Sequence, residues 1–138
     1  MNLPKEIQDS FQETQTVFLS TVSGDEPRVR PVILIYYEST FWIATGYNDA
    51  KIRQIKVNNN IEFCLPFDER KEFCYIRVTG KAQIVQDISE KRMLLENIDF
   101  LKEYWQQADD PTYALLRIDV REIEYLRVNE MLAVRQKI

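Results

Sequence analysis

A succession of short β-branched and aromatic runs, joined by turn signals rather than by helices, is the feature that most constrains the fold of this chain. We predict strands over residues 16–22, 28–37, 40–45, 61–67, 73–85, 113–120 and 122–128. Strands that follow one another through turns pair antiparallel, because parallel pairing needs a long crossover connection. The pattern therefore predicts a mostly β fold, in which six to seven mainly antiparallel strands with a few helices close into a small barrel.

Helical spacing interrupts the strand pattern in three places, and we predict helices over residues 4–15, 49–57 and 89–105. The last helix would begin with Ser89 as its cap and end an apolar stripe at Trp105, which we interpret as core or dimer interface, with a cofactor-facing role as the alternative. A length of 138 residues is typical of one domain and no linker divides the chain, so we predict a single domain over residues 1–138. The last ten residues are ambiguous and are interpreted as a tail that packs on a partner.

Two single residues predict irregularities within strands. Pro31 lies inside the predicted strand 28–37, and proline is confined to sheet edges and bulges because it has no backbone N–H. Gly80 lies inside the predicted strand 73–85, where an isolated glycine is typical of a β-bulge.

The chain has no histidine and only three glycines, Gly24, Gly46 and Gly80, and these counts exclude several chemistries. Without histidine there is no Ser-His-Asp triad and no HExxH zinc site. Three scattered glycines form neither a Walker loop nor a GxGxxG turn, and two cysteines cannot complete a four-ligand thiolate site, so no metal is expected. Any phosphate must therefore be held by side chains and by backbone amides at a helix end.

Net charge and hydropathy exclude further classes of protein. The formal net charge of −4 argues against a nucleic-acid partner, which would require a broad basic face. The first six residues carry no apolar stretch typical of a signal peptide, and no apolar run is long enough to span a bilayer. We therefore expect a cytoplasmic protein with no membrane partner.

The two cysteines, Cys64 and Cys74, are ten residues apart in two apolar runs. If these runs pair around a charged turn over residues 68–71, the two cysteines could be cross-strand neighbours. We interpret them as buried, reduced thiols that act as small hydrophobic residues, with a redox role as the alternative.

The segment 28–56 is locally basic, with five basic residues against two acidic ones, a net charge of +3. Arg28 and Arg30 are two residues apart on a predicted strand, so both project to the same face. Lys51 falls in the first turn of the next predicted helix, where unpaired amides and the helix dipole favour an anion. With the hydroxyl of Thr45 at the end of the intervening strand, these residues predict a phosphate site that uses no glycine loop.

A simpler interpretation of the same residues remains open. Arg28 and Arg30 could form the solvated face of an exposed strand, and Lys51 could be a surface residue of its helix. Asp49, the expected N-cap of that helix, also weakens an anion site unless it points away or serves only as the cap.

At these residues the sequence resembles the pyridoxamine 5′-phosphate oxidase-like split-barrel flavoproteins, over roughly residues 16–128. The resemblance rests on motifs in the family's order: the strand Val17–Val22, the run Gly24–Val32, Ala44-Thr45-Gly46 followed by Lys51, the stop Asn58–Asn60, and Val78–Ala82. The ending Glu124-Tyr125 is similar to that of the short general-stress-protein-like members.

The resemblance implies a split barrel that forms a homodimer, with FMN bound in the groove between the subunits. It places Arg30 and the backbone of Pro31 and Val32 against the flavin, and Thr45 and Lys51 near the phosphate and ribityl chain. Arg28 matches the family pattern less closely than these residues, and Tyr75 stands where the family has a glutamine near the flavin ring. The cofactor-binding candidates are thus Arg28, Arg30, Pro31, Val32, Ala44, Thr45, Lys51 and Tyr75.

Three departures separate this chain from the oxidases of the family. Those enzymes often carry Ser-Arg-Lys where Asp49-Ala50-Lys51 stands here, and a second lysine where Ile35 stands. They also use an Arg-x-His pair near the C-terminus for the pyridoxal substrate, and this chain has no histidine. We therefore do not expect pyridoxamine 5′-phosphate oxidase activity.

Three functions are compatible with these observations. The first is a homodimeric FMN-binding oxidoreductase that acts on an unidentified small-molecule substrate or electron donor, with no catalytic residue assigned. The second is a barrel that binds another cofactor, either F420 or haem, of which haem is disfavoured by the absence of histidine. The third is a non-enzymatic flavin-binding stress protein.

Overall fold

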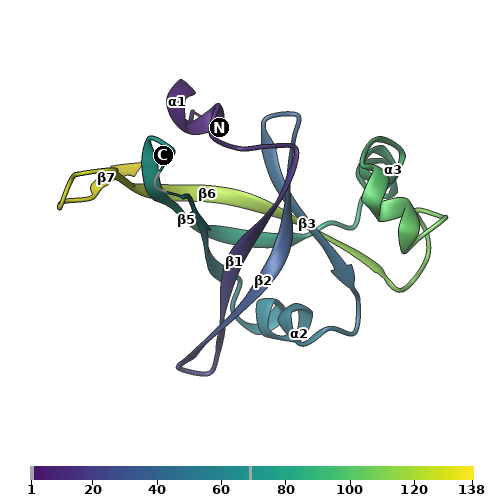
Figure 1. Ribbon diagram of the computed structural model, residues 1–138. Coiled ribbons are helices and arrows are strands. Elements are labelled where there is room, and N and C mark those ends of the chain that lie inside the picture. The colour runs from purple at the N-terminus through teal and green to yellow at the C-terminus, as the bar shows by residue number, and fades with distance from the viewer. Residues whose placement is uncertain (1, 69) are drawn as a thin grey trace.

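The computed structural model describes residues 2–68 and 70–138, and Figure 1 shows how its elements are arranged. In chain order the elements are α1 (Lys5–Gln8), β1 (Thr14–Ser23), β2 (Glu26–Tyr37), β3 (Thr40–Gly46), α2 (Ala50–Val57), β4 (Asn60–Pro66), β5 (Phe73–Ile84), α3 (Ile88–Asn97), the 3-10 helix η1 (Asp99–Glu103), β6 (Tyr113–Arg127) and β7 (Val134–Lys137). In this described part of the chain, no helix is long and apolar enough to cross a membrane.

The described strands form one sheet of seven, in the order β3-β2-β1-β4-β5-β6-β7, and each neighbouring pair is antiparallel. A further antiparallel pairing joins β3 to β6, so the sheet closes on itself as a ring of six strands with β7 attached outside. The prediction of a mostly β fold with antiparallel strands is therefore confirmed.

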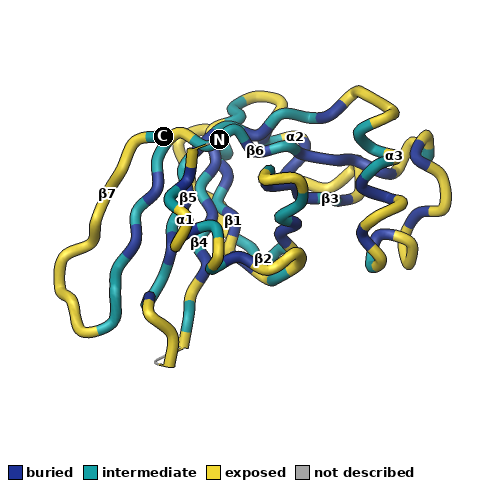
Figure 2. Tube along the Cα trace, turned by 90° about the horizontal axis from the view of Figure 1, so that it is seen from above, coloured by how far each residue is buried: buried dark blue, intermediate teal, exposed yellow. Residues whose placement is uncertain are grey.

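Alternating side chains of the ring fill its interior with one apolar core. Phe41 from β3 and Phe63 from β4 meet edge to face there, with their ring centroids 5.2 Å apart. A second core, which includes Ile35, Trp42 and Tyr113, lies between the ring and the α3–η1 segment. Figures 1 and 2 show α3 and β7 at opposite ends of the molecule, so α3 and η1 cover one end of the sheet only.

Two predicted helices end earlier than expected. The N-terminal helix stops at Gln8 because Phe11 leaves it to pack 4.8 Å from Phe41 in the ring, between ring centroids. The helix predicted from Ser89 begins instead at Ile88, with Asp87 as its N-cap. It stops at Asn97, and η1 follows as a separate 3-10 helix.

The C-terminal region also differs from the prediction. One continuous strand, β6, replaces the two strands predicted over 113–120 and 122–128. The last residues were interpreted as a tail that packs on a partner, but they form β7, which pairs with β6 of the same chain over Glu122–Tyr125. Figure 2 shows this hairpin at one end of the molecule, with β7 exposed and the paired part of β6 partly buried.

The irregularities predicted at Pro31 and Gly80 are confirmed. Pro31 lies in the part of β2 that pairs with β1 only, since β3 pairs with β2 only from Ile35 to Tyr37. The β5–β6 register shifts between Thr79 and Gly80, and a Cβ at Gly80 would overlap the backbone carbonyl oxygen of Asp119.

The cysteines are not the cross-strand neighbours that the sequence suggested. Cys64 lies opposite Arg77 in the β4–β5 pair, whereas Cys74 lies near the hairpin end, where its carbonyl accepts the N–H of Phe67. Both thiols are free and half-buried. Position 69, in the predicted turn between the two strands, lies outside the described residues.

Candidate functional site

A cavity of about 390 Å³ opens between strands β2 and β3 of the ring on one side and η1 with the residues after it on the other. Its wall comes from β2, from the end of β3, from the first turn of α2, and from η1 with the two residues that follow. The lining residues are Pro31, Val32, Ile33, Ala44, Thr45, Gly46, Lys51, Phe100, Tyr104 and Trp105. Five residues that the sequence predicted for cofactor binding, Pro31, Val32, Ala44, Thr45 and Lys51, are thus brought together here.

Lys51 forms the polar end of this cavity. The side chain of Asp49 caps α2 by accepting the backbone N–H of Lys51 at 3.0 Å, which directs the start of the helix toward β3. The Lys51 Nζ then donates to Thr45 Oγ1 at 2.8 Å and forms an ion pair with Asp49 Oδ1 at 2.9 Å. The residue is only 7% exposed, so its ammonium is held in place by these two partners.

Asp49 carries its negative charge at neutral pH. Burial alone would raise the pKa of this carboxyl, but two hydrogen bonds from Lys51 and the positive charges of Lys51 and Arg30 outweigh it. The net result is a pKa below the ordinary value of aspartate. The positive group that faces the cavity is therefore already paired with an anion from the chain itself.

Arg30 lies near this pair but does not line the cavity. Its guanidinium donates to Gln54 Oε1 at 2.9 Å and to the Leu19 carbonyl at 3.3 Å, which ties β2 to α2 and β1. Thr21 also donates its hydroxyl to the same Gln54 oxygen at 2.5 Å. Burial lowers the pKa of Arg30, while the nearby carboxylate of Asp49 opposes that effect.

The two remaining predicted residues lie further from the cavity in the single chain. Arg28 is exposed at the start of β2 and pairs with Glu26 at 2.7 Å. Tyr75 lies on β5, where its hydroxyl donates to Glu124 Oε2 at 3.2 Å and the Arg77 guanidinium lies 5.5 Å from its ring centroid. Their assignment to the cofactor site stays a prediction.

An aromatic wall, defined by Phe100, Tyr104 and Trp105, forms the opposite side of the cavity. Trp105 is fixed by a hydrogen bond from Nε1 to Thr112 Oγ1 at 3.1 Å. It also stacks on Tyr113, with 4.8 Å between the ring centroids. Tyr104 is 67% exposed and presents its ring to the opening, beside Trp105.

Sequence reasoning gave Trp105 a cofactor-facing role only as an alternative, and it did not assign Phe100 or Tyr104 to the site. The apolar stripe did indicate that Trp105 is covered, as the structure shows. The place of Phe100 and Tyr104 depends on η1, which forms only after the chain turns at Ile98, so no local pattern shows it.

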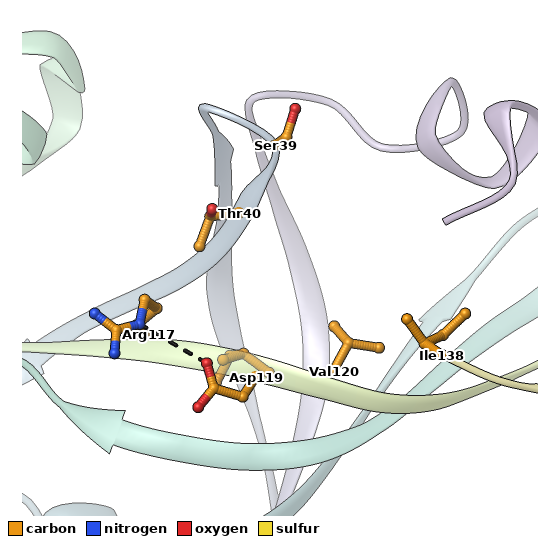
Figure 3. A pocket seen from close by; sticks show the side chains of 7 residues that line it. Ser39, Thr40, Arg117, Asp119, Val120 and Ile138 are labelled. Atoms are coloured by element: carbon orange, nitrogen blue, oxygen red, sulfur yellow. Dashed lines mark ion pairs between the residues drawn. The ribbon is translucent and has the colours of Figure 1, made fainter. Parts of the chain in front are cut away.

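A second cavity, of about 320 Å³, lies beside the β2–β3 turn and is shown in Figure 3. Its cation is Arg117, which pairs with Asp119 at 3.8 Å and with Glu90 at 3.3 Å. Two carboxylates compensate this arginine, whereas one compensates Lys51 in the first cavity, so the second cavity favours an anion less. It contains none of the residues that the sequence predicted for a site, and we take the first cavity as the candidate site.

The first cavity can bind an elongated ligand that has a polar anchor and a flat ring. The buried ammonium and hydroxyl can hold an oxygen-rich group, and the aromatic wall can cover a planar apolar one. Within residues 2–68 and 70–138, no group of three or more Cys, Asp or Glu side chains is placed to hold a metal ion. The arrangement is that of an organic-ligand site.

The fold and this site together define a small β protein with a cavity that joins a buried ammonium to an aromatic wall. The family model described as pyridoxamine 5′-phosphate oxidase matches residues 3–127. The chain therefore belongs to the pyridoxamine 5′-phosphate oxidase family, as its motifs indicated.

Solved structures show the same fold. General Stress Protein 26 from Bacillus anthracis is 26% identical with a TM-score of 0.74, and the match covers 96% of this chain and 97% of that one. A NimC/NimA family protein from Clostridium acetobutylicum is 23% identical with a TM-score of 0.78, covering 97% and 91%. A heme binding protein from Mycobacterium smegmatis is 14% identical with a TM-score of 0.70, covering 91% and 53%. No curated protein matches the sequence.

Proposed function

We propose that this protein is an FMN-binding flavoprotein that forms a homodimer of split barrels and acts as an oxidoreductase on a small molecule. The observation that carries the proposal is the cavity that joins the buried ammonium of Lys51 to an aromatic wall. Its volume of about 390 Å³ lies within the range of organic-ligand sites. Membership of the pyridoxamine 5′-phosphate oxidase family supports a flavin as that ligand.

The lining residues fit the two ends of FMN. Lys51 and Thr45 would hold the phosphate and ribityl oxygens, since both present hydrogen-bond donors at the polar end. Phe100 and Trp105 would cover the ring system, together with the backbone of Pro31 and Val32. When bound, the flavin supplies hydride or electron transfer, and the protein orients the ring and excludes water from it.

An exposed apolar surface beside the cavity supports the homodimer. Phe18 and Val29 are 44% and 69% exposed, and the β1–β2 register places Phe18 opposite Pro31 and Ile33 opposite Thr16 on the same outer face. Contiguous exposed apolar surface is typical of an interface. Because Pro31 and Ile33 also line the cavity, a second copy packed on this face would cover the opening of the cavity. That copy would also bring residues to the cavity that a single chain does not place there.

The experiment that tests the proposal is the visible absorption spectrum of the purified protein, followed by titration with FMN. We expect a yellow protein, or a colourless one that quenches FMN fluorescence with a stoichiometry of one per chain. Size-exclusion chromatography with light scattering would report a dimer. A protein that neither carries a flavin spectrum nor quenches FMN fluorescence would refute the proposal.

The same titration separates the alternative functions. F420 added in parallel would bind more tightly than FMN if the cavity serves a deazaflavin, and hemin would give a Soret band if it serves haem. A protein that binds FMN, but whose bound flavin is reduced neither by NAD(P)H nor by a chemical donor that reduces free FMN, would favour the non-enzymatic flavin-binding alternative.

A further inference from the structure

The ammonium at the polar end of the cavity is paired with an anion supplied by the chain itself. Asp49 Oδ1 accepts both the backbone N–H of Lys51, at 3.0 Å, and its ammonium, at 2.9 Å. Arg30, the next nearest cation, also interacts electrostatically with this carboxylate. Both positive groups near the cavity are thus partly compensated before any ligand arrives.

We propose that Asp49 is a specificity-determining residue, which weakens the preference of this site for a phosphate-bearing flavin over an uncharged one. The proposal rests on the proposed flavin function, and it specifies which charge on the flavin the site favours. A phosphate that approaches Lys51 meets the Asp49 carboxylate on the same ammonium, and like charges this close repel each other. An uncharged ribityl end meets no such repulsion.

The exposure of Asp49 limits the size of this effect without removing it. The side chain is 44% exposed, so water screens its charge on one side. The Oδ1 atom of Asp49 is held beside the Lys51 ammonium, because the same oxygen accepts the backbone N–H that caps α2. The cap therefore prevents the carboxylate from moving away when an anion binds.

The variant Asp49→Asn isolates the charge from the cap, since asparagine is an equally good N-cap residue. A matched control is Asp87→Asn, because Asp87 caps α3 in the same way, accepting the N–H of Ser89 at 2.8 Å, whereas Ser89, unlike Lys51, does not line the cavity. Dissociation constants of FMN and riboflavin would be measured for the wild type and both variants by flavin fluorescence. If Asp49→Asn does not fold, Asp49→Ser is used in its place, because serine keeps a capping oxygen and carries no charge.

We expect the ratio of the riboflavin Kd to the FMN Kd to rise about tenfold in Asp49→Asn, equivalent to about 1.4 kcal/mol, and to stay unchanged in Asp87→Asn. A ratio that stays unchanged in Asp49→Asn while both flavins bind would overturn this inference and leave the flavin function standing.

A second measurement decides the inference if no flavin binds at all. Inorganic phosphate is added to each variant, and the rise in Tm is recorded. A larger rise for Asp49→Asn than for the wild type and Asp87→Asn would support the role of Asp49 and refute the flavin function. Equal rises in all three proteins, with no flavin bound, would overturn both.

Discussion

Replacement of Lys51 by methionine removes the ammonium from the cavity and keeps most of the volume of the side chain. The lysine is 7% exposed and donates to Thr45 at 2.8 Å, so it is positioned before a ligand binds. A charge-assisted hydrogen bond to phosphate contributes about 1.5–3 kcal/mol, which corresponds to a rise of about 10- to 150-fold in Kd. The carboxylate of Asp49 shares the ammonium, so we expect the lower part of this range for FMN.

Riboflavin distinguishes loss of the phosphate contact from general damage to the site. Its Kd should change less than about threefold in Lys51→Met, because it has no phosphate to lose. We expect the free energy of unfolding to change by no more than about 1 kcal/mol, since the half-exposed Asp49 is hydrated when its partner is removed.

The assay is fluorescence titration of both flavins, with Lys56→Met as the control. Lys56 lies on the same helix but is exposed and donates to the Tyr47 hydroxyl outside the cavity. An FMN Kd within about threefold of the wild-type value for a folded Lys51→Met protein would refute the reasoning, because the buried ammonium would then not contact the phosphate.

Three further predictions concern the interface, the bulge and acid stability. Phe18→Glu should convert the dimer to a monomer in analytical ultracentrifugation with an unchanged circular dichroism spectrum, and a persistent dimer would place the interface elsewhere. Gly80→Ala should lower the free energy of urea unfolding by about 1–3 kcal/mol, because its Cβ would meet the Asp119 carbonyl, and an unchanged value would mean that the bulge can shift. The lowered pKa of Asp49 contributes stability that is present above its unfolded pKa and lost as the pH falls through its folded pKa. Urea unfolding between pH 5 and 3 should therefore show a smaller loss for Asp49→Asn than for the wild type, and equal losses would contradict this.

The strands of the ring were predictable because their signals are local. Alternation of buried and exposed residues and the turn residues between β1, β2 and β3 lie within a few positions of each other. Two strands divided at Arg121 were predicted here, but β6 runs through the whole charged stretch Asp119–Glu122. Its charged side chains are at least partly exposed, and the same stretch pairs with β5 across the bulge at Gly80.

The polar end of the site was predictable for the same reason, whereas its aromatic side was not. Thr45 and Lys51 are six residues apart, and the end of a strand followed by a capped helix brings them within hydrogen-bond distance. The sequence also indicated Asp49 as a cap that could weaken an anion site, and the structure shows it paired with Lys51. The position of Tyr104 requires η1 to pack against β3 and β6, which no spacing within the chain reports.

The two ends of the cavity belong to different structural units. The polar end is formed by the end of β3 and the capped first turn of α2. A substitution at Lys51 or Asp49 therefore changes how the site recognises a charged ligand, with little effect on the aromatic wall. The wall is carried by the segment after α3, which packs on a separate apolar core with Tyr113. Recognition of the anionic anchor and recognition of the flat ring can therefore change independently in this fold, and the absence of histidine leaves neither end with an imidazole for proton transfer near neutral pH.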